Sequence, residues 1–215
     1  MYTEAKNFEQ GALRLTNQQL LDVAKKFNIK PNVLYSVIVN ETGGRKAFDN
    51  LNRPIILFEG HIFYKLLKAK GFDVEKLDDS DKDVNNILYE KWADRDDAYK
   101  LVQYDRLESA ILIDKDSALQ SASYGIGQIM GMNYKICGYD NVEDFVKDMY
   151  HSEAKQLEIM LKFITANKTM YAALQKEDFA TFAKLYNGPG YAQNKYDVKL
   201  KATADKFRTA TVFIK

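Results

Sequence analysis

The chain has 215 residues, which suits one domain built around a single hydrophobic core. Its 31 Lys and Arg residues nearly balance its 30 Asp and Glu residues, which excludes an overall electrostatic attraction to nucleic acid or to an anionic membrane. A hydrophobic fraction of 46% argues against global disorder. We therefore expect one folded domain over residues 1–215.

Cysteine, histidine and hydropathy patterns exclude further classes of protein. The single cysteine, Cys137, cannot form an internal disulfide, and we expect a buried thiol. His61 and His151 are the only histidines, and no His or Cys cluster has the spacing of metal ligands, so we expect no metal and no cofactor. Residues 1–11 lack the pattern of a signal peptide and no apolar run reaches 18 residues, which predicts synthesis in the cytoplasm and no membrane insertion.

Two helices are predicted at the start of the chain. Thr16 is a typical N-cap for a helix over 17–27, where apolar residues recur with helical spacing. Pro31 suits the first turn of a second helix, which the glycine pair at 43–44 ends. Glu41 is therefore expected at the C-terminal end of the second helix.

One short strand is predicted within an otherwise helical chain. The apolar run at 55–58 follows the turn-forming residues Asn50, Asn52 and Pro54, which indicates a strand or hairpin as the only sheet. Helical periodicity then returns over 61–70, 99–113, 142–149, 153–166, 168–175, 178–186 and 191–208, with an acidic connection at 73–83, a new start at 114 or 117, and a turn at 187–190. The expected fold class is mostly α, an α+β helical bundle with one small β-hairpin near residues 48–60.

Glu41 occupies an unusual position on the second predicted helix. It shares one helix face with Leu34, Val37 and Ile38, so the face that enters the core also carries a carboxyl group. Burial and the negative end of the helix dipole both disfavour the ionised form, which predicts a raised pKa, as a general acid requires. Periodicity alone does not identify this site, because a glutamate in a last helical turn more often points to water.

Three short motifs follow one another along the chain. They are Asn40-Glu41-Thr42-Gly43-Gly44, Ser123-Tyr124-Gly125-Ile126-Gly127-Gln128-Ile129-Met130 and Leu185-Tyr186-Asn187-Gly188. In this order they resemble the Glu-Ser, Gly-Leu-Met-Gln and Tyr-Asn-Gly motifs of goose-type lysozymes and soluble lytic transglycosylases. A longer match, over about residues 16–207, resembles the phage-type N-acetylmuramidase domain of endolysins. The segments that carry this match are 53–63, 104–107, 122–131 and 186–193.

The resemblance implies a lysozyme-like fold and hydrolysis of the β-1,4 bond between N-acetylmuramic acid and N-acetylglucosamine, with Glu41 protonating the leaving oxygen. Thr42 replaces the usual Ser after the Glu and keeps a hydroxyl group. We expect a monomer that binds bacterial peptidoglycan strands, carries no separate wall-binding module, and reaches the wall after release or delivery from the cytoplasm. Two alternatives stay open: a lytic transglycosylase giving 1,6-anhydro products, and a non-catalytic peptidoglycan-binding protein.

A hydrolase of this kind needs a second group that orients water or stabilises the transition state. Glu59 is the leading candidate, because it ends the apolar strand and precedes His61. Asp49, on the turn after the Glu41 helix, is the alternative. Glu59 could instead be a structural ion-pair partner.

The residues predicted to contact the glycan are His61, Ser123, Tyr124, Gly125, Gln128, Tyr186 and Asn187. Glycines at 125 and 127 would let the backbone approach a sugar ring, while the Gln128 amide would bind an N-acetyl group. The ring of Tyr186 would pack against the sugar. Each has a structural alternative. His61 could be a packing histidine, the segment with the two glycines could be an ordinary glycine-rich turn, and Tyr186 could be a core aromatic followed by Asn187 as a cap. Trp92 and Tyr89 are candidate groove aromatics, although core packing is the favoured interpretation.

Overall fold

The computed structural model describes residues 14–44, 47–78, 86–95 and 97–214. Part of the acidic connection expected at 73–83 lies outside these residues. The α-helices are α1 Asn17–Lys26, α2 Pro31–Thr42, α3 Gly60–Ala69, α4 Val74–Asp78, α5 Gln103–Gln120, α6 Val142–Met149, α7 Glu153–Ala166, α8 Lys168–Gln175, α9 Phe179–Asn187 and α10 Tyr196–Lys206. The strands are β1 Ile56–Phe58, β2 Ala122–Tyr124 and β3 Ile129–Met130, and short 3₁₀ turns include η3 Trp92–Arg95, η4 Ala98–Lys100, η5 Gly125–Gly127, η6 Gly131–Asn133 and η7 Pro189–Ala192.

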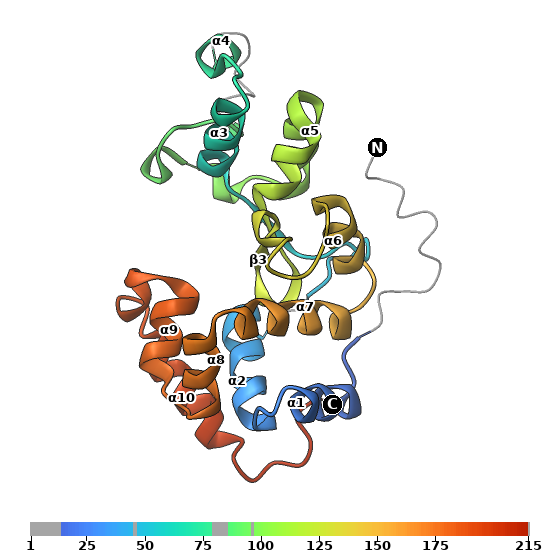
Figure 1. Ribbon diagram of the computed structural model, residues 1–215, viewed down its shortest axis with the longest axis vertical. Helices are drawn as coiled ribbons and strands as arrows, with labels where there is room; N and C mark the ends of the chain where they lie inside the picture. The colour runs from blue at the N-terminus through green and yellow to red at the C-terminus, as the bar shows by residue number, and fades with distance from the viewer. Residues whose placement is uncertain (1–13, 45–46, 79–85, 96, 215) are drawn as a thin grey trace.

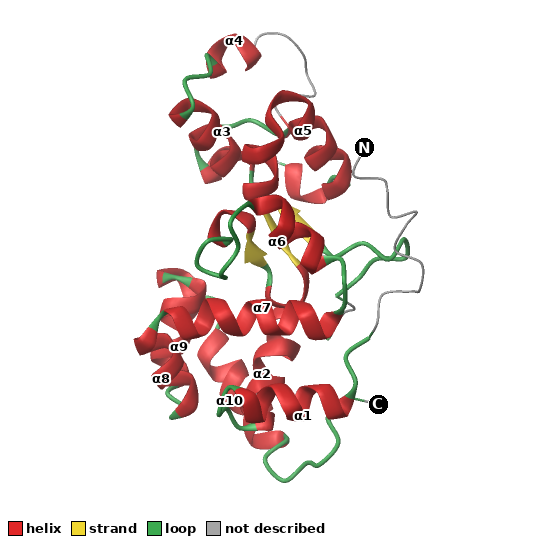
Figure 2. Ribbon diagram, turned by 45° about the vertical axis from the view of Figure 1, so that its right-hand side comes forward, coloured by secondary structure: helices red, strands yellow, loops and turns green. Residues whose placement is uncertain are grey.

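The molecule has two helical lobes with a small sheet between them (Figure 1). The lower lobe contains α1, α2, α8, α9 and α10, and the upper lobe contains α3, α4, α5 and residues 86–95 and 97–100. Helix α7 crosses the molecule between the sheet and the lower helices, where it contacts η5, α1 and α8 (Figure 2). Helix α5 joins the upper lobe to β1 and β2. The mostly helical, lysozyme-like fold class is therefore confirmed.

The sheet differs from the expected hairpin. Strand β1 pairs antiparallel with β2, with Leu57 opposite Ser123, and β2 pairs antiparallel with β3. Within residues 48–60 only one bridge forms, between Phe48 and Pro54. The apolar strand was correctly located, but its partner lies more than sixty residues further along the chain. Strand pairing across such a separation leaves no local turn signal in the sequence.

Capping residues in the sequence predicted several helix ends correctly. Thr16 and Gln19 form a capping box at the start of α1, which satisfies backbone N–H groups that the helix itself leaves free. Helix α5 has a non-helical residue at Asp114, whose carboxylate accepts a hydrogen bond from the N–H of Ser117, as expected for a new helical start. The last helix begins at Tyr196, later than the predicted 191, because η7 and a turn come first.

The hydrophobic core runs through both lobes. Helix α2 buries Val33, Leu34 and Val37, and the sheet buries Phe58 and Tyr124. Cys137 is buried, as expected. No helix among the described residues combines the length and the apolar composition needed to cross a membrane.

A buried arginine organises the upper lobe. Arg106 of α5 donates hydrogen bonds to the backbone carbonyls of Phe58 and Asn86 and to the hydroxyl of Tyr89. These bonds fasten the segment that begins at residue 86 to the end of β1. They therefore fix where the following residues, including Trp92, lie relative to the sheet.

Candidate active site

Glu41 lies where the lower lobe meets the sheet. Proline at the first position starts α2, and Gly43, in the left-handed conformation with φ of 57°, ends it. Glu41 is thus in the last turn, and α2 packs against both α10 and η5. The sequence predicted this position for Glu41 correctly.

The carboxyl group of Glu41 is held by a tyrosine from the last helix. The hydroxyl of Tyr196, the first residue of α10, donates a short hydrogen bond to Oε1 of Glu41. Burial raises the pKa of Glu41 to about 7, against a smaller lowering by the Tyr196 bond. Near neutral pH the protonated and ionised forms therefore coexist. Burial also raises the pKa of Tyr196, so its hydroxyl stays a donor.

Tyr186 connects Glu41 to the glycine segment of the sheet. Its hydroxyl donates a 2.8 Å hydrogen bond to the carbonyl oxygen of Gly127, and its ring stacks on Phe182 at 5.2 Å. Burial and the nearby charge of Glu41 both raise the pKa of Tyr186. The structure thus brings together residues from all three motifs, at positions 41, 127 and 186.

Tyr196 was missed by the sequence analysis. It lies 155 residues from Glu41 in the sequence and is the first residue of α10. No local sequence pattern marks it as a partner of Glu41. Only the packing of α10 against α2 brings the two side chains together.

Ser123 and Tyr124, which were predicted to contact the glycan, both use their hydroxyl groups inside the protein, and their contact with the glycan stays a prediction. Tyr124 is fully buried, and its hydroxyl donates a 3.0 Å hydrogen bond to the carbonyl oxygen of Leu119. Ser123 is 6% exposed, and its hydroxyl donates to Oε1 of Gln128 at 2.9 Å. As the central strand, β2 has both of its edges paired, and all three of its residues are buried.

Gly125 has a structural role, and its predicted approach to a sugar stays a prediction. A Cβ atom at this position would lie 2.4 Å from the side chain of Gln156, and φ is +66°. The Gln156 amide accepts from the N–H of Ile126 and donates to the carbonyl of Met149, so it cannot easily move away. Gly127 meets Met160 of α7 in the same way. Both glycines serve the packing of η5 on α7.

Gln128 uses its amide inside the protein. The Nε2 atom donates to the carbonyl oxygens of Gly125 at 2.9 Å and Ile55 at 3.2 Å, while Oε1 accepts from Ser123. Both amide hydrogens are therefore engaged, which leaves none for an N-acetyl group. Gln128 has φ of 46°, and the three bonds offset the cost of this left-handed backbone.

Glu59 lies in the upper lobe, in a different environment from Glu41. Its Oε2 accepts a 2.5 Å hydrogen bond from the hydroxyl of Tyr99, which in turn accepts one from Nε1 of Trp92 at 3.1 Å. His61 Nδ1 lies 3.4 Å from the same carboxylate oxygen, without a hydrogen bond. Burial lowers the pKa of His61, so its ring is neutral near pH 7. The ring stacks on buried Tyr89.

Strand β1 separates Glu59 from the neighbourhood of Glu41. The carbonyl of Ile55 accepts from Gly125 beside η5, whereas the N–H of Glu59 bonds to Ser121 at the other end of the strand. Four residues of extended chain span about 13 Å. Glu59 therefore lies at the end of β1 away from η5, and a catalytic role for Glu59 stays a prediction.

The remaining candidates have mixed outcomes. Asp49 accepts from the N–H groups of Leu51 and Arg53 and pairs with the Arg53 guanidinium at 2.9 Å, so it stabilises its own turn. Asn187 is exposed at the end of α9, just before Gly188. Trp92 is 53% exposed, against the expectation of core packing.

Among the described residues no group of three or more His, Cys, Asp or Glu side chains comes together as possible metal ligands.

Comparisons with known proteins agree with this arrangement. The family model for N-acetylmuramidase matches residues 30–208 of the chain. The crystal structure of the Burkholderia AP3 phage endolysin is similar at 33% sequence identity with a TM-score of 0.78, over 98% of this chain and 77% of that one. No curated protein was found to match the chain.

Proposed function

The chain belongs to the N-acetylmuramidase family and is a peptidoglycan hydrolase of the glycoside hydrolase type, and we propose that it cleaves the β-1,4 bond between N-acetylmuramic acid and N-acetylglucosamine with Glu41 as the general acid. The observation that carries this proposal is the Glu41 carboxyl group, which burial holds at a pKa of about 7 in the last turn of α2. An exposed glutamate would be ionised at neutral pH and would have no proton to give.

Proton delivery follows from the contacts of Glu41. The Tyr196 hydroxyl donates to Oε1, so the transferable proton sits on Oε2. When Oε2 gives this proton to the glycosidic oxygen, the Tyr196 hydrogen bond stabilises the carboxylate that remains. Burial keeps the acid protonated beforehand, and the tyrosine limits the cost of ionisation afterwards.

A second candidate reaction, lytic transglycosylation, also has support. Burial and Tyr196 account for the shifted pKa of Glu41, and no other carboxylate among the described residues contributes to it. A two-carboxylate hydrolase holds its second group about 5 to 9.5 Å away, where it would raise that pKa further. A single glutamate suffices if the muramic acid 6-hydroxyl attacks in place of water, which gives a 1,6-anhydro product.

Mass spectrometry of digested peptidoglycan tests both reactions. Purified walls are digested, the products are reduced with borohydride, and the sugar at the new end is identified. Reduced muramic acid at that end supports muramidase activity, whereas 1,6-anhydromuramic acid would replace hydrolysis by the second reaction. Reduced glucosamine would contradict both, because it places the cut at the other glycosidic bond.

The isosteric variant Glu41→Gln is the control for this digest. It keeps the acceptor for Tyr196 but has no acidic proton. We expect no released fragments and unchanged binding to walls. A wild-type chain that binds walls but releases nothing under the same conditions would support the third interpretation, a non-catalytic peptidoglycan-binding protein.

A further inference from the structure

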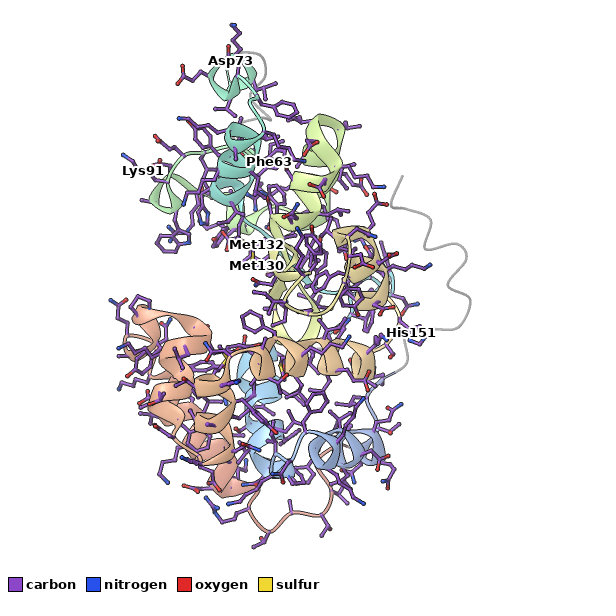
Figure 3. All side chains as sticks on the ribbon, viewed as in Figure 1. Phe63, Asp73, Lys91, Met130, Met132 and His151 are labelled. Carbon is purple, nitrogen blue, oxygen red and sulfur yellow. The ribbon has the colours of Figure 1, made fainter. Side chains whose placement is uncertain are left out.

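A ligand-sized cavity lies in the upper lobe, and Glu41 is not among the residues that line it. Its volume is about 570 Å³, within the usual range for small-ligand sites. One wall is a face of α3 that includes Lys65 and Lys68, and the other is the segment with Lys91 and Trp92. We call it the Trp92 cavity. In Figure 3, which draws the described side chains, Lys91 lies on the side where the upper lobe and α9 stand apart.

The Trp92 cavity carries an excess of positive charge. Its lining includes three lysines and only one carboxylate, that of Glu90. His61 adds no charge, because its ring is neutral near pH 7. Among the described residues none of these three lysines forms an ion pair, whereas Lys26, Lys70 and Lys115 each do. Lys65 lies close enough to His61 to help lower the pKa of that ring. The cavity is therefore complementary to a negatively charged ligand.

Trp92 supplies a flat, fixed surface in the same cavity. The Arg95 guanidinium covers its ring with a separation of 3.3 Å, and its Nε1 donates to the Tyr99 hydroxyl. About half of the residue stays exposed. An exposed aromatic ring that is already fixed loses little conformational entropy when a sugar ring stacks on it.

The Trp92 cavity adjoins the group that contains Glu59. Tyr99 joins Trp92 to the Glu59 carboxylate, and His61 belongs to both the cavity wall and the Glu59 contacts. This group stands at the far end of β1 from η5, beside which Glu41 lies.

We propose that the Trp92 cavity is a remote subsite for a carboxylate-bearing saccharide unit of the glycan strand. The unit stacks on Trp92, while Lys65 and Lys91 bind its carboxylate. This inference rests on the proposed function, because it names what a peptidoglycan strand would offer there. The carboxylate belongs either to the lactyl group of muramic acid or to the peptide stem attached to it.

Tryptophan fluorescence tests the proposal directly, because Trp92 is the only tryptophan of the chain. The Glu41→Gln chain is titrated with three oligosaccharides of equal length: a neutral chitin oligomer, a glycan stripped of stems and a stem-bearing glycan. We expect the emission of Trp92 to change with at least one acidic glycan, at about ten-fold lower concentration than with chitin, as a charge contact worth about 1.4 kcal/mol gives. The stripped glycan identifies the lactyl carboxylate, and a response to the stem-bearing glycan alone identifies the stem.

Two double variants separate specific binding from a general charge effect. Lys65→Met/Lys91→Met should weaken binding of the acidic glycans about ten-fold and leave the chitin titration unchanged. Lys25→Met/Lys199→Met removes the same charge from exposed positions on α1 and α10 and should change neither. Equal affinity for chitin and both acidic glycans, or unchanged binding after loss of Lys65 and Lys91, would overturn the proposal.

The outcomes also distinguish this inference from the proposed function. If wild type releases muramic-acid-ended fragments but Trp92 does not respond to any glycan, only the subsite is wrong. If Trp92 responds as expected but no fragments appear, the subsite stands and the proposed reaction is wrong.

Discussion

Glu41 and Glu59 each accept a short hydrogen bond from a tyrosine hydroxyl, but they lie in different lobes and at opposite kinds of helix end. Glu41 is in the last turn of α2, where the helix dipole is unfavourable to negative charge. Glu59 is the N-cap residue of α3, where the dipole favours negative charge. A tyrosine partner alone therefore does not determine the role of a carboxyl group.

The surroundings of the two groups make the difference clearer. Burial raises the pKa of Glu41 to about 7, so a large fraction of the groups still holds a proton at neutral pH, and Tyr196 is the one hydrogen-bond partner of this side chain among the described residues. Glu59 anchors a chain of contacts through Tyr99 to Trp92. The first arrangement stores a proton, and the second fixes the position of aromatic side chains. Paired substitutions can test this distinction.

The largest expected effect is on catalysis. Glu41→Gln should reduce the rate of wall clearing by about 10³-fold, as expected when a general acid is lost. Glu59→Gln should reduce it by about five-fold, because a neutral amide still accepts the Tyr99 hydrogen bond but with about 1 kcal/mol less stabilisation than a charged acceptor. Loss of light scattering by purified walls measures both rates.

The size of the Glu59 effect decides between two mechanisms. A loss as complete as that of Glu41→Gln would place both carboxylates in the reaction and remove the distinction drawn above. Retention of more than about half of the activity would show that Glu59 contributes neither to the reaction nor to the position of the substrate.

The next largest effect is on stability. Between pH 4.5 and about 7 the unfolded chain has released the Glu41 proton while the folded chain still holds it, so the Glu41 contribution makes folding less favourable as pH rises. Glu41→Gln removes this penalty and should raise the free energy of unfolding by about 3 kcal/mol at pH 8, with little change at pH 4. Urea unfolding at both pH values measures it.

Glu108→Gln is the matched control for this experiment. Glu108 is exposed on α5, so its substitution should leave the two unfolding free energies within about 0.5 kcal/mol of wild type. Equal stability of Glu41→Gln and wild type at pH 8 would mean that the Glu41 carboxylate is well solvated, and the general-acid proposal would lose its physical basis.

Local sequence features predicted the position of Glu41 but not its partner. The apolar residues of α2 and the glycines that end it are all within eleven residues of Glu41, so periodicity and capping were sufficient. Tyr196 and the β1–β2 pairing depend on contacts between distant segments. Such contacts are decided by packing, which no local pattern encodes.

The glycine motif shows a different limit. Resemblance to the family correctly drew attention to residues 123–128, but it did not distinguish a residue that touches substrate from one that supports the site. Gly125 is small because Gln156 fills the space beside it, and Tyr124 is buried in the central strand. In both cases the neighbouring side chain, unknown from sequence, determines the role.

The smallest expected effect concerns the pH profile. The Tyr196 hydrogen bond stabilises the ionised form of Glu41 and so lowers its pKa, which burial raises to about 7. Activity needs the protonated acid and should therefore fall as pH rises through about 7. Tyr196→Phe removes the bond, so the pKa should rise and the fall in kcat/KM should move upward by about one pH unit.

Tyr99→Phe completes the comparison, because it removes the corresponding bond from Glu59. Tyr99 bonds to Glu59 and not to Glu41. If only Glu41 supplies the proton, kcat/KM of this variant should fall at the same alkaline pH as in the wild type. Its effect should be on the fluorescence of Trp92, which loses the acceptor for its indole N–H. A shift of the alkaline fall in Tyr99→Phe, and none in Tyr196→Phe, would reverse the assignment and make Glu59 the group whose proton controls the rate.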